Sequence, residues 1–438
     1  MSALSHDAAR TTDSQEASPQ EASLPVAKTP EPSSAGLMAR LGRWWDRDRM
    51  HTAAELRALY AARLTDTGAN RTAKEWCAQY IAADGKGRRA LLTQLVEAGA
   101  SLEPRGDQGL HLFRRLNAQT GNLQLMVDLR ADMLRWHNQI AGLIVLEREL
   151  EALLSNWFDV GMLELKPITW DSPASLLEKL IQFEAVHEIR SWEELKHRVA
   201  DNRRCYAFFH PRMSDVPLIF VEVAFAHQMA DNVQVLLDPQ TPAESLSKAR
   251  WAIFYSISNT QPGLRGISFG NFLLKRVIEE LLRETPRLKF FATLSPIPGF
   301  ADWLKKQDSQ VLQALLHHRT ETETHTPSQA GARWAAKLQE AAVGNTPELV
   351  QNAALKLAAH YLTTLKNGRP IDPVARFHLG NGARMERVNW AADRSAKGLE
   401  QSCSLMVNYL YDLGELDQNL VQLAAGKPNL GRNLKRLL

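Results

Sequence analysis

The sequence has little cysteine, little net charge and no long apolar run. Its 438 residues include three cysteines, Cys77, Cys205 and Cys403, which lie far apart and in no spacing typical of metal ligands. This usage indicates a reducing compartment and no disulfide framework. A formal net charge of +3 is too small to indicate nucleic acid or an anionic membrane surface as a partner. No stretch approaches the roughly 18 apolar residues of a membrane span, so we expect no membrane partner either.

Recognisable targeting signals are also missing. The first residues lack the pattern of a signal peptide, and early acidic residues such as Asp7 and Asp13 argue against a transit peptide. The last four residues, Lys-Arg-Leu-Leu, do not match the Ser-Lys-Leu address of peroxisomes. We therefore expect a cytoplasmic protein.

Composition and periodicity predict three parts. Residues 1–36 are rich in Ser, Ala, Pro, Thr and Glu and predict a disordered tail. Residues 37–165 carry apolar positions three and four apart, which predicts a helical bundle for packing and self-association. Residues 166–438 alternate strand-like and helical segments, which predicts an α/β domain with a mixed sheet. The predicted strands of its first half are 206–209, 218–225, 233–237, 251–256 and 288–294.

Further elements are predicted from the same periodicity. A long helix is expected over 122–158, with a candidate break near Gly142, and another over 347–365. Short strands are expected over 374–378 and 385–390, and a final amphipathic helix over 395–412. Residues 307–346 are polar and predict a solvated loop; the histidines there (His317, His318, His325) lack the spacing of a metal site.

The most informative stretch runs from Trp251 to Trp303. A buried-strand composition is followed by the glycine-bearing turn Gln261–Gly266, then by an amphipathic helix that begins near Phe269. Such a turn presents free N–H groups and the positive end of a helix dipole to one point, where a phosphate binds well. Many such turns bind nothing, and neither the P-loop nor the G-x-G-x-x-G spacing is present.

Two side chains are candidates for chemistry. Ser295 follows a predicted strand and precedes Pro-Ile-Pro-Gly, at the edge where reacting groups gather in open α/β sheets. A proline-glycine turn in which the serine is only a local cap is the alternative. His378 lies in Phe-His-Leu-Gly-Asn-Gly, at a predicted strand end, and could equally be a structural histidine.

Four separated motifs carry a resemblance to a known family. They are FYSISNTQPGLRGISFGNFLLKRV, LSPIPGF, FHLGNGA and MVNYLY, in that order, with RRCYAFFHP and PLIFVEVAF ahead of them. Together they resemble malonyl-CoA decarboxylases from roughly Trp44 to Leu413. The resemblance implies a helical N-terminal domain and a catalytic domain similar to the acetyl-CoA-dependent N-acetyltransferase fold. It also implies malonyl-CoA as substrate, acetyl-CoA as product and a homo-oligomer, with a tetramer expected.

The resemblance also implies roles for individual residues. Ser295 matches the family's catalytic serine, His378 its proton donor and Tyr411 a tyrosine near the site. Tyr411 could equally be a buried helix aromatic with a satisfied hydroxyl. The pyrophosphate of CoA is expected over Arg265, Gly266, Ile267, Ser268, Phe269, Gly270 and Asn271. Ser268 stands where some family members have an active-site glutamate; Glu222 is a candidate substitute, and His210 has no assigned role.

The implied reaction needs no metal or organic cofactor. Losing CO2 from a malonyl thioester leaves an enolate, so the site must stabilise an oxygen and deliver a proton to carbon. A histidine with a pKa near neutrality would deliver it. The thioester is itself the electron sink, so we expect no metal and no organic cofactor. Two alternatives stay open: an acyl-CoA-dependent N-acyltransferase, and a catalytically silent acyl-CoA-binding scaffold.

Overall fold

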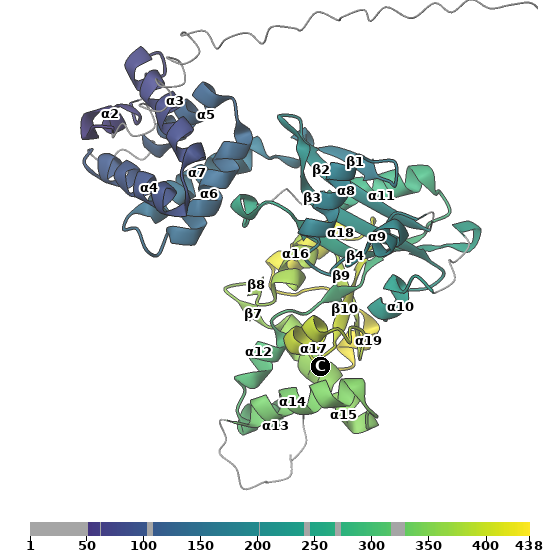
Figure 1. Cartoon of the computed structure of the whole chain (residues 1–438). Helices are drawn as coiled ribbons and strands as arrows, with labels where there is room; N and C mark the ends of the chain where they lie inside the picture. Colours follow the sequence, from purple (N-terminus) through teal and green to yellow (C-terminus); the bar gives the residue numbers. More distant parts are fainter. Residues whose placement is uncertain are drawn as a thin grey trace, which may run out of the picture. The chain divides into compact units, whose positions relative to one another are not determined.

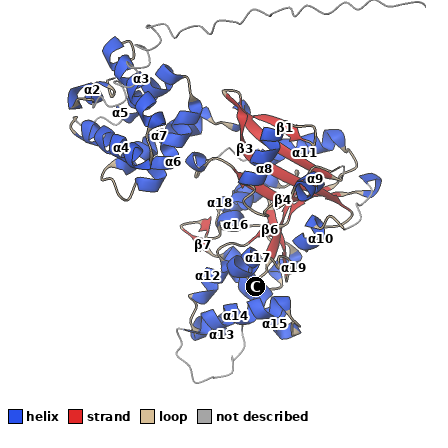
Figure 2. Cartoon of the chain, in the orientation of Figure 1, coloured by secondary structure: helices blue, strands red, loops and turns tan. Residues whose placement is uncertain are grey.

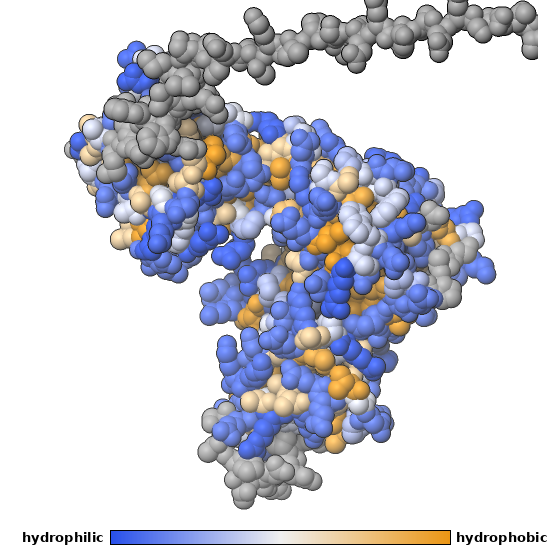
Figure 3. All heavy atoms as spheres, viewed as in Figure 1, coloured by the Kyte–Doolittle hydropathy of each residue, from blue (hydrophilic) through white to orange (hydrophobic). Residues whose placement is uncertain are grey.

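The computed structural model describes residues 51–61, 63–102, 108–200, 202–240, 246–267, 273–316 and 329–438. The predicted tail, residues 1–36, and the histidines at 317, 318 and 325 lie outside the described residues. Within the described part, a helical region is followed by a mixed sheet with helices, which confirms the predicted fold class (Figures 1 and 2). The face drawn in Figure 3 is largely hydrophilic, as expected where apolar side chains are buried in a core.

The helical region gathers around buried aromatic and leucine side chains. Aspartate or asparagine begins several of its helices: Asp66, Asp84 and Asn122 each accept a hydrogen bond from the N–H three residues on. The predicted helix over 122–158 is two helices, and Gly142 before the second has a φ of +83°. The helices are α2 Ala53–Ala58, α3 Thr67–Ala82, α4 Gly85–Ala100, α5 Gln108–Thr120, α6 Leu123–Trp136 and α7 Leu143–Trp157.

The main sheet has the order β1-β2-β3-β4-β5-β10-β6, and β9 pairs with β10. All of these pairs are antiparallel except β4 with β5. β1 already spans residue 165, where the sequence places a domain boundary, so the predicted division into domains stays a prediction. The strands are β1 Glu164–Ile168, β2 Arg203–His210, β3 Met213–Ala226, β4 Trp251–Asn259, β5 Phe290–Thr293, β6 Ser295–Pro296, β9 Arg384–Asn389 and β10 Met406–Tyr411; β7 Leu365–Lys366 and β8 Arg369–Pro370 form a separate hairpin.

Helices cover both faces of the sheet because its strands are apolar on both. Along β2, Tyr206 and Phe208 join the main core, whereas Ala207 and Phe209 join a second cluster on the opposite face. The main core includes α11, and the second cluster includes α8 and α9. The helices that follow β1 are α8 Ala174–Phe183, α9 Trp192–Arg198, α10 Val233–Leu237, α11 Leu273–Glu284, α12 Phe300–Lys305, α13 Ser309–Leu316, α14 Ala330–Val343, α15 Glu348–Thr363, α16 Pro373–Gly380, α17 Ala396–Ser402, α18 Leu416–Ala424 and α19 Arg432–Lys435.

Strand β4 pairs with β5 over only part of its own length. Their parallel pairing runs from Trp251 opposite Phe290 to Phe254 opposite Thr293, but β4 continues to Asn259. An irregularity in the register with β3, between Glu222 and Val223, lies beside the point where this pairing stops. The far half of β4 is therefore left open on the side away from β3.

Two segments that were predicted as strands are helices, and each begins with a side-chain N-cap. Residues 233–237 form helix α10 because the Asn232 side chain accepts from the N–H of Val235. Residues 374–378 lie in helix α16, where the Asp372 side chain accepts from the N–H of Ala375 and Pro373 takes the first helical position. Both strand predictions are wrong, because an N-cap outweighs a short β-branched run.

Two further predictions need correction. The helix predicted over 395–412 ends at Ser402, since Cys403 and Ser404 have φ angles of 50° and 69°, and the chain continues as strand β10. The loop predicted over 307–346 contains helices α13 and α14; residues 317–328 within it lie outside the described residues. The helix over 347–365 and the strand over 385–390 are confirmed as α15 and β9.

One ion pair is buried inside the α/β region. Arg198 Nη1 lies 2.6 Å from Glu222 Oε2, with side-chain exposures of 4% and 0%. Arg198 Nη2 also donates to the carbonyl of His187. Burial raises the pKa of Glu222 to about 7, although Arg198 opposes this. Each charge is therefore held in place by the other.

We predict that Arg198→Met lowers the free energy of unfolding by about 3–5 kcal/mol, because it leaves Glu222 buried without its partner. The double variant Arg198→Met/Glu222→Leu should recover most of that loss, since neither charge remains. Urea unfolding of both variants measures the difference. A double variant that is as unstable as the single one would contradict this account.

Candidate active site

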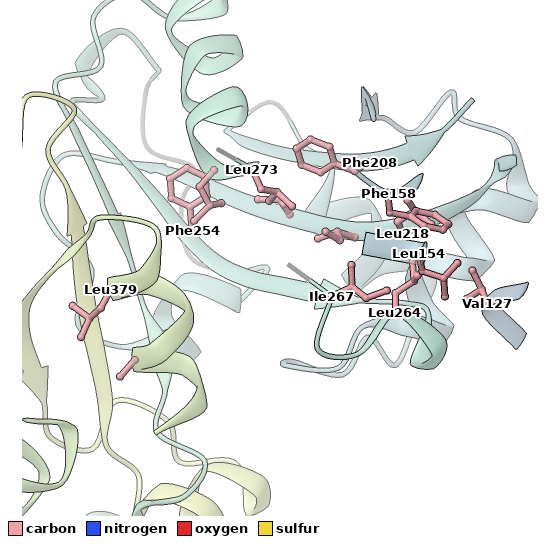
Figure 4. Packing of buried hydrophobic residues seen from close by; sticks show 14 of the residues in the cluster. Val127, Leu154, Phe158, Phe208, Leu218, Phe254, Leu264, Ile267, Leu273 and Leu379 are labelled. Carbon is pink, nitrogen blue, oxygen red and sulfur yellow. The ribbon is translucent and has the colours of Figure 1, made fainter. Parts of the chain in front are cut away.

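A cavity of about 420 Å³ opens where β4 and β5 separate. Its walls come from the far half of β4, the turn after it, the start of β6 and helix α16. Apolar side chains form one side, among them Phe254, Leu264, Ile267 and Leu273, which belong to the buried cluster of Figure 4. Ser295 and His378 line the same cavity. A mostly apolar cavity with a few convergent polar groups is the usual form of a ligand site.

The three predicted catalytic residues come together from three elements. Strand β10 pairs with both β5 and β6, so Tyr411, opposite Phe291, and Ser295, opposite Val407, lie on neighbouring strands. His378 is in the last turn of α16, and not at a strand end. Tyr411 is in strand β10, and not in a helix. All three side chains are buried.

A chain of hydrogen bonds connects them. The Tyr411 hydroxyl lies 2.7 Å from His378 Nδ1, and His378 Nε2 lies 3.1 Å from Ser295 Oγ. The Ser295 hydroxyl donates to Thr293 Oγ1 at 2.8 Å. Because that proton of Ser295 is already used, its oxygen accepts from the Nε2–H of His378. Nδ1 of His378 is then the acceptor and takes the proton of the Tyr411 hydroxyl.

Tyr409 and Thr293, which were not predicted from the sequence, hold this series of hydrogen-bonded side chains in place. The Tyr409 ring stacks on the His378 ring, with centroids 4.5 Å apart and an interplanar angle of 26°. Thr293 Oγ1 accepts hydrogen bonds from the Ser295 hydroxyl and from the backbone N–H of Tyr409. Thr293 precedes Ser295 by two residues, which is the spacing of side chains on one face of a strand. That spacing was the signal available in the sequence.

Burial sets the protonation of the site. It lowers the pKa of His378 from 6.5 to about 3, so the ring is neutral at neutral pH. Burial also raises the pKa of Tyr411 well above its usual value, so its hydroxyl keeps its proton. The structure thus differs from the expected histidine with a pKa near neutrality. The site therefore holds a neutral imidazole with one N–H donor.

The predicted substrate-binding turn borders the cavity. Arg265, Gly266 and Ile267 all line it, and Gly266 has a φ of +85°, a conformation that favours glycine. The helix after the turn is α11, whose described residues begin at Leu273. The remaining predicted residues, Ser268, Phe269, Gly270 and Asn271, lie outside the described residues.

The two candidates without a firm role are not at the cavity. Glu222 is paired with Arg198, as described above, and does not line the cavity. His210 Nδ1 accepts the N–H of Arg212, and its Nε2 lies 3.1 Å from the carbonyl of Trp157. Both side chains therefore stabilise the fold. In the part of the chain that the structure describes, no group of three or more His, Cys, Asp or Glu residues is placed to hold a metal.

Comparison with known proteins identifies the family. The sequence model of the malonyl-CoA decarboxylase C-terminal domain matches residues 161–437, and that of the N-terminal domain matches residues 73–158. A curated mouse (Mus musculus) protein, malonyl-CoA decarboxylase, mitochondrial, is 38% identical over 335 residues, which is 72% of this chain and 68% of the mouse protein. The chain belongs to the malonyl-CoA decarboxylase family.

Solved structures of malonyl-CoA decarboxylases share the fold. The protein from Cupriavidus metallidurans is 50% identical, with a TM-score of 0.78 over 91% of this chain and all of that one. The protein from Agrobacterium vitis is 39% identical, with a TM-score of 0.67 over 92% of this chain and 96% of that one. Among the described residues, no helix has the length and apolar character needed to cross a membrane.

The buried His378 gives this malonyl-CoA decarboxylase family member a testable pH dependence. Between its ordinary pKa of 6.5 and its folded value of about 3, the unfolded chain binds a proton that the folded chain does not. The free energy of unfolding should therefore fall as the pH drops through this window, by up to about 1.4 kcal/mol per pH unit. His378→Gln should remove this contribution.

Urea unfolding of the wild type and His378→Gln at about pH 7 and about pH 5 tests this pH dependence of the free energy of unfolding. The wild type should lose more stability on acidification than the variant. His187 also has a pKa lowered by burial, to about 4, but it is present in both proteins and cancels in the difference. Equal losses in the two proteins would contradict the buried neutral ring.

Proposed function

We propose that this protein decarboxylates malonyl-CoA to acetyl-CoA and CO2. The observation that carries the proposal is the chain from Tyr411 through His378 to Ser295, buried at the wall of a cavity that the glycine turn also borders. Membership of the malonyl-CoA decarboxylase family supports the substrate. The cavity contains a donor for carbon protonation and space for an acyl thioester.

The reaction uses these groups in a defined order. The bond between the α-carbon and the carboxylate breaks, CO2 leaves, and the electron pair moves onto the thioester as an enolate. Hydrogen-bond donors at the cavity wall stabilise the enolate oxygen as its charge develops. The Nε2 proton of His378 passes to the α-carbon and leaves the ring as an imidazolate anion, which the Tyr411 hydroxyl stabilises through its hydrogen bond to Nδ1. Solvent restores the proton after acetyl-CoA leaves.

The neutral state of His378 suits this role. A charged imidazolium would bind the malonyl carboxylate tightly and stabilise the substrate before CO2 leaves. A neutral N–H instead interacts most strongly with the enolate, where negative charge appears on the thioester. Triosephosphate isomerase also keeps a histidine neutral in its active site, where the ring polarises a carbonyl oxygen. Ser295 keeps the Nε2–H directed at the cavity wall until the substrate arrives.

The CoA part of the substrate has a separate place. The far half of β4, from Ser256 to Asn259, is open toward the cavity and suits the extended pantetheine arm. We propose that the pyrophosphate binds at the turn from Arg265 to Asn271, ahead of helix α11. Arg265 is exposed at the rim, where a phosphate is accessible to it.

The proposal also covers cofactors, localisation and oligomeric state. The thioester is the electron sink, so the reaction is proposed to need neither a metal nor an organic cofactor. We also propose a cytoplasmic homo-oligomer, with a tetramer as the expected form. The helical region is the proposed site of self-association.

Incubation with malonyl-CoA alone tests the function. We expect CO2 and acetyl-CoA to be released without any acceptor. Release only when an amine is added, with transfer of the acyl group to it, would instead identify an N-acyltransferase. Binding of CoA with neither product would identify a scaffold.

Two variants test the proton donor. His378→Asn and Ser295→Ala should keep the fold and the affinity for CoA but lower kcat by about 10²–10⁴, the usual range for general acid catalysis. The double variant should lose less than the product of the two, because the residues act as one unit. His210→Asn is the matched control: this buried histidine lies away from the cavity, so kcat should not change. A folded His378→Asn protein with full kcat would remove His378 from the mechanism.

A further inference from the structure

One buried arginine joins the helical region to the substrate-facing turn. Arg130 of helix α6 has a side-chain exposure of 2%. Its Nη1 donates to the carbonyl of Gly263 at 2.7 Å and to that of Arg265 at 2.8 Å. Its other nitrogens face helix α7, where Glu147 Oε1 lies 2.9 Å and Glu151 Oε1 3.4 Å from Nη2. The guanidinium thus binds two carboxylates on one side and two turn carbonyls on the other.

The turn also approaches α6 closely. The space where a Cβ on Gly263 would lie is only 1.8 Å from the carbonyl oxygen of Val127, so only glycine fits. Gln124, on the same helix, donates to the side chain of Gln261 at 3.0 Å. Val127 and Leu264 belong to one buried cluster, part of which Figure 4 shows. The turn is therefore held by packing, by a close backbone approach and by Arg130.

Holding the Arg265 carbonyl also directs the next N–H. In a trans peptide the C=O of one residue and the N–H of the next point in opposite directions. With the Arg265 carbonyl turned toward Arg130, the N–H of Gly266 points away from Arg130. Gly266 lines the cavity and is exposed, and within the described residues its N–H has no acceptor. It is a donor prepared for a ligand.

We propose that Arg130 is a positioning residue for substrate binding, which orients the Gly266 N–H toward an oxygen acceptor on the CoA part of the substrate. This inference rests on the proposed function, because it takes the turn as the CoA site. Glu147 and Glu151 compensate the charge of Arg130, so the arginine acts through geometry and not by attracting phosphate. The helical region thereby contributes to substrate binding without touching the substrate.

The chain offers a matched control in Arg115. This arginine is also fully buried, at 0% exposure, and its guanidinium donates to the carbonyls of Leu59, Ala61 and Arg63. All of these partners lie within the helical region. Arg115→Met therefore removes a buried carbonyl-binding guanidinium of the same kind without touching the turn.

The experiment compares Arg130→Met, Arg130→Lys and Arg115→Met with the wild type. Lysine keeps the cation beside Glu147, so that variant folds even if Arg130→Met does not. Its ammonium has only three donors, too few to replace the contacts of the guanidinium with both glutamates and both carbonyls. Melting temperature, Kd for CoA by calorimetry, KM and kcat with malonyl-CoA, and hydrogen exchange of the peptide covering 261–267 are measured on each protein.

Both Arg130 variants should raise Kd and KM by about tenfold, the cost of one misdirected hydrogen bond, with kcat within about threefold. Exchange in 261–267 should become faster. Arg115→Met should lower the melting temperature but leave Kd, KM and this exchange unchanged. Arg130→Lys with wild-type Kd and exchange would overturn the proposal, as would an equal rise of Kd in Arg115→Met.

The result also separates this proposal from the proposed function. A wild type that binds CoA but releases no CO2 would refute the decarboxylase alone, and the Kd and exchange data would still decide the role of Arg130. A wild type that does not bind CoA would refute both.

Discussion

The site depends on a neutral imidazole buried between three elements. A polar ring taken out of water is tolerated only if its nitrogens find partners, and His378 has one on each side. Tyr411 and Ser295 supply them from neighbouring strands, and Tyr409 fixes the plane of the ring. Strands β10 and β6 and helix α16 must therefore hold a single arrangement. The geometry of the site is a consequence of satisfying these buried groups.

The opposite side of the cavity is constrained by the same rule. The turn from Gln261 to Ile267 borders the cavity, so contacts on its other side must hold it. Arg130 binds its carbonyls from behind, and Glu147 balances the buried charge. Binding chemistry at an exposed turn is thus supported by a buried polar contact from another part of the chain. Leu264 and Ile267 belong to the main buried cluster, and their packing also holds the turn in this position.

Buried charge has two different uses in this fold. The pair of Arg198 and Glu222 is enclosed behind the sheet, and each partner mainly compensates the other. Arg130 has the same degree of burial but leaves two of its donors to the turn. A family glutamate expected near Ser268 is not replaced by Glu222, because that carboxylate is committed to its arginine. In the proposed reaction, proton delivery is therefore assigned to the groups around His378.

The sequence by itself determined the fold class, the strand from Trp251, the amphipathic helix α11 and, through family motifs, the residues Ser295, His378 and Tyr411. These signals are local, since composition and periodicity act over a few residues. Helix α16 and strand β10 were assigned wrongly, because short apolar runs suit either structure until a cap or a neighbouring strand decides. The protonation of His378 and the contact of Arg130 with a carbonyl 133 residues away were decided only by the tertiary structure. Burial and partners distant in sequence leave no local pattern from which they could be predicted.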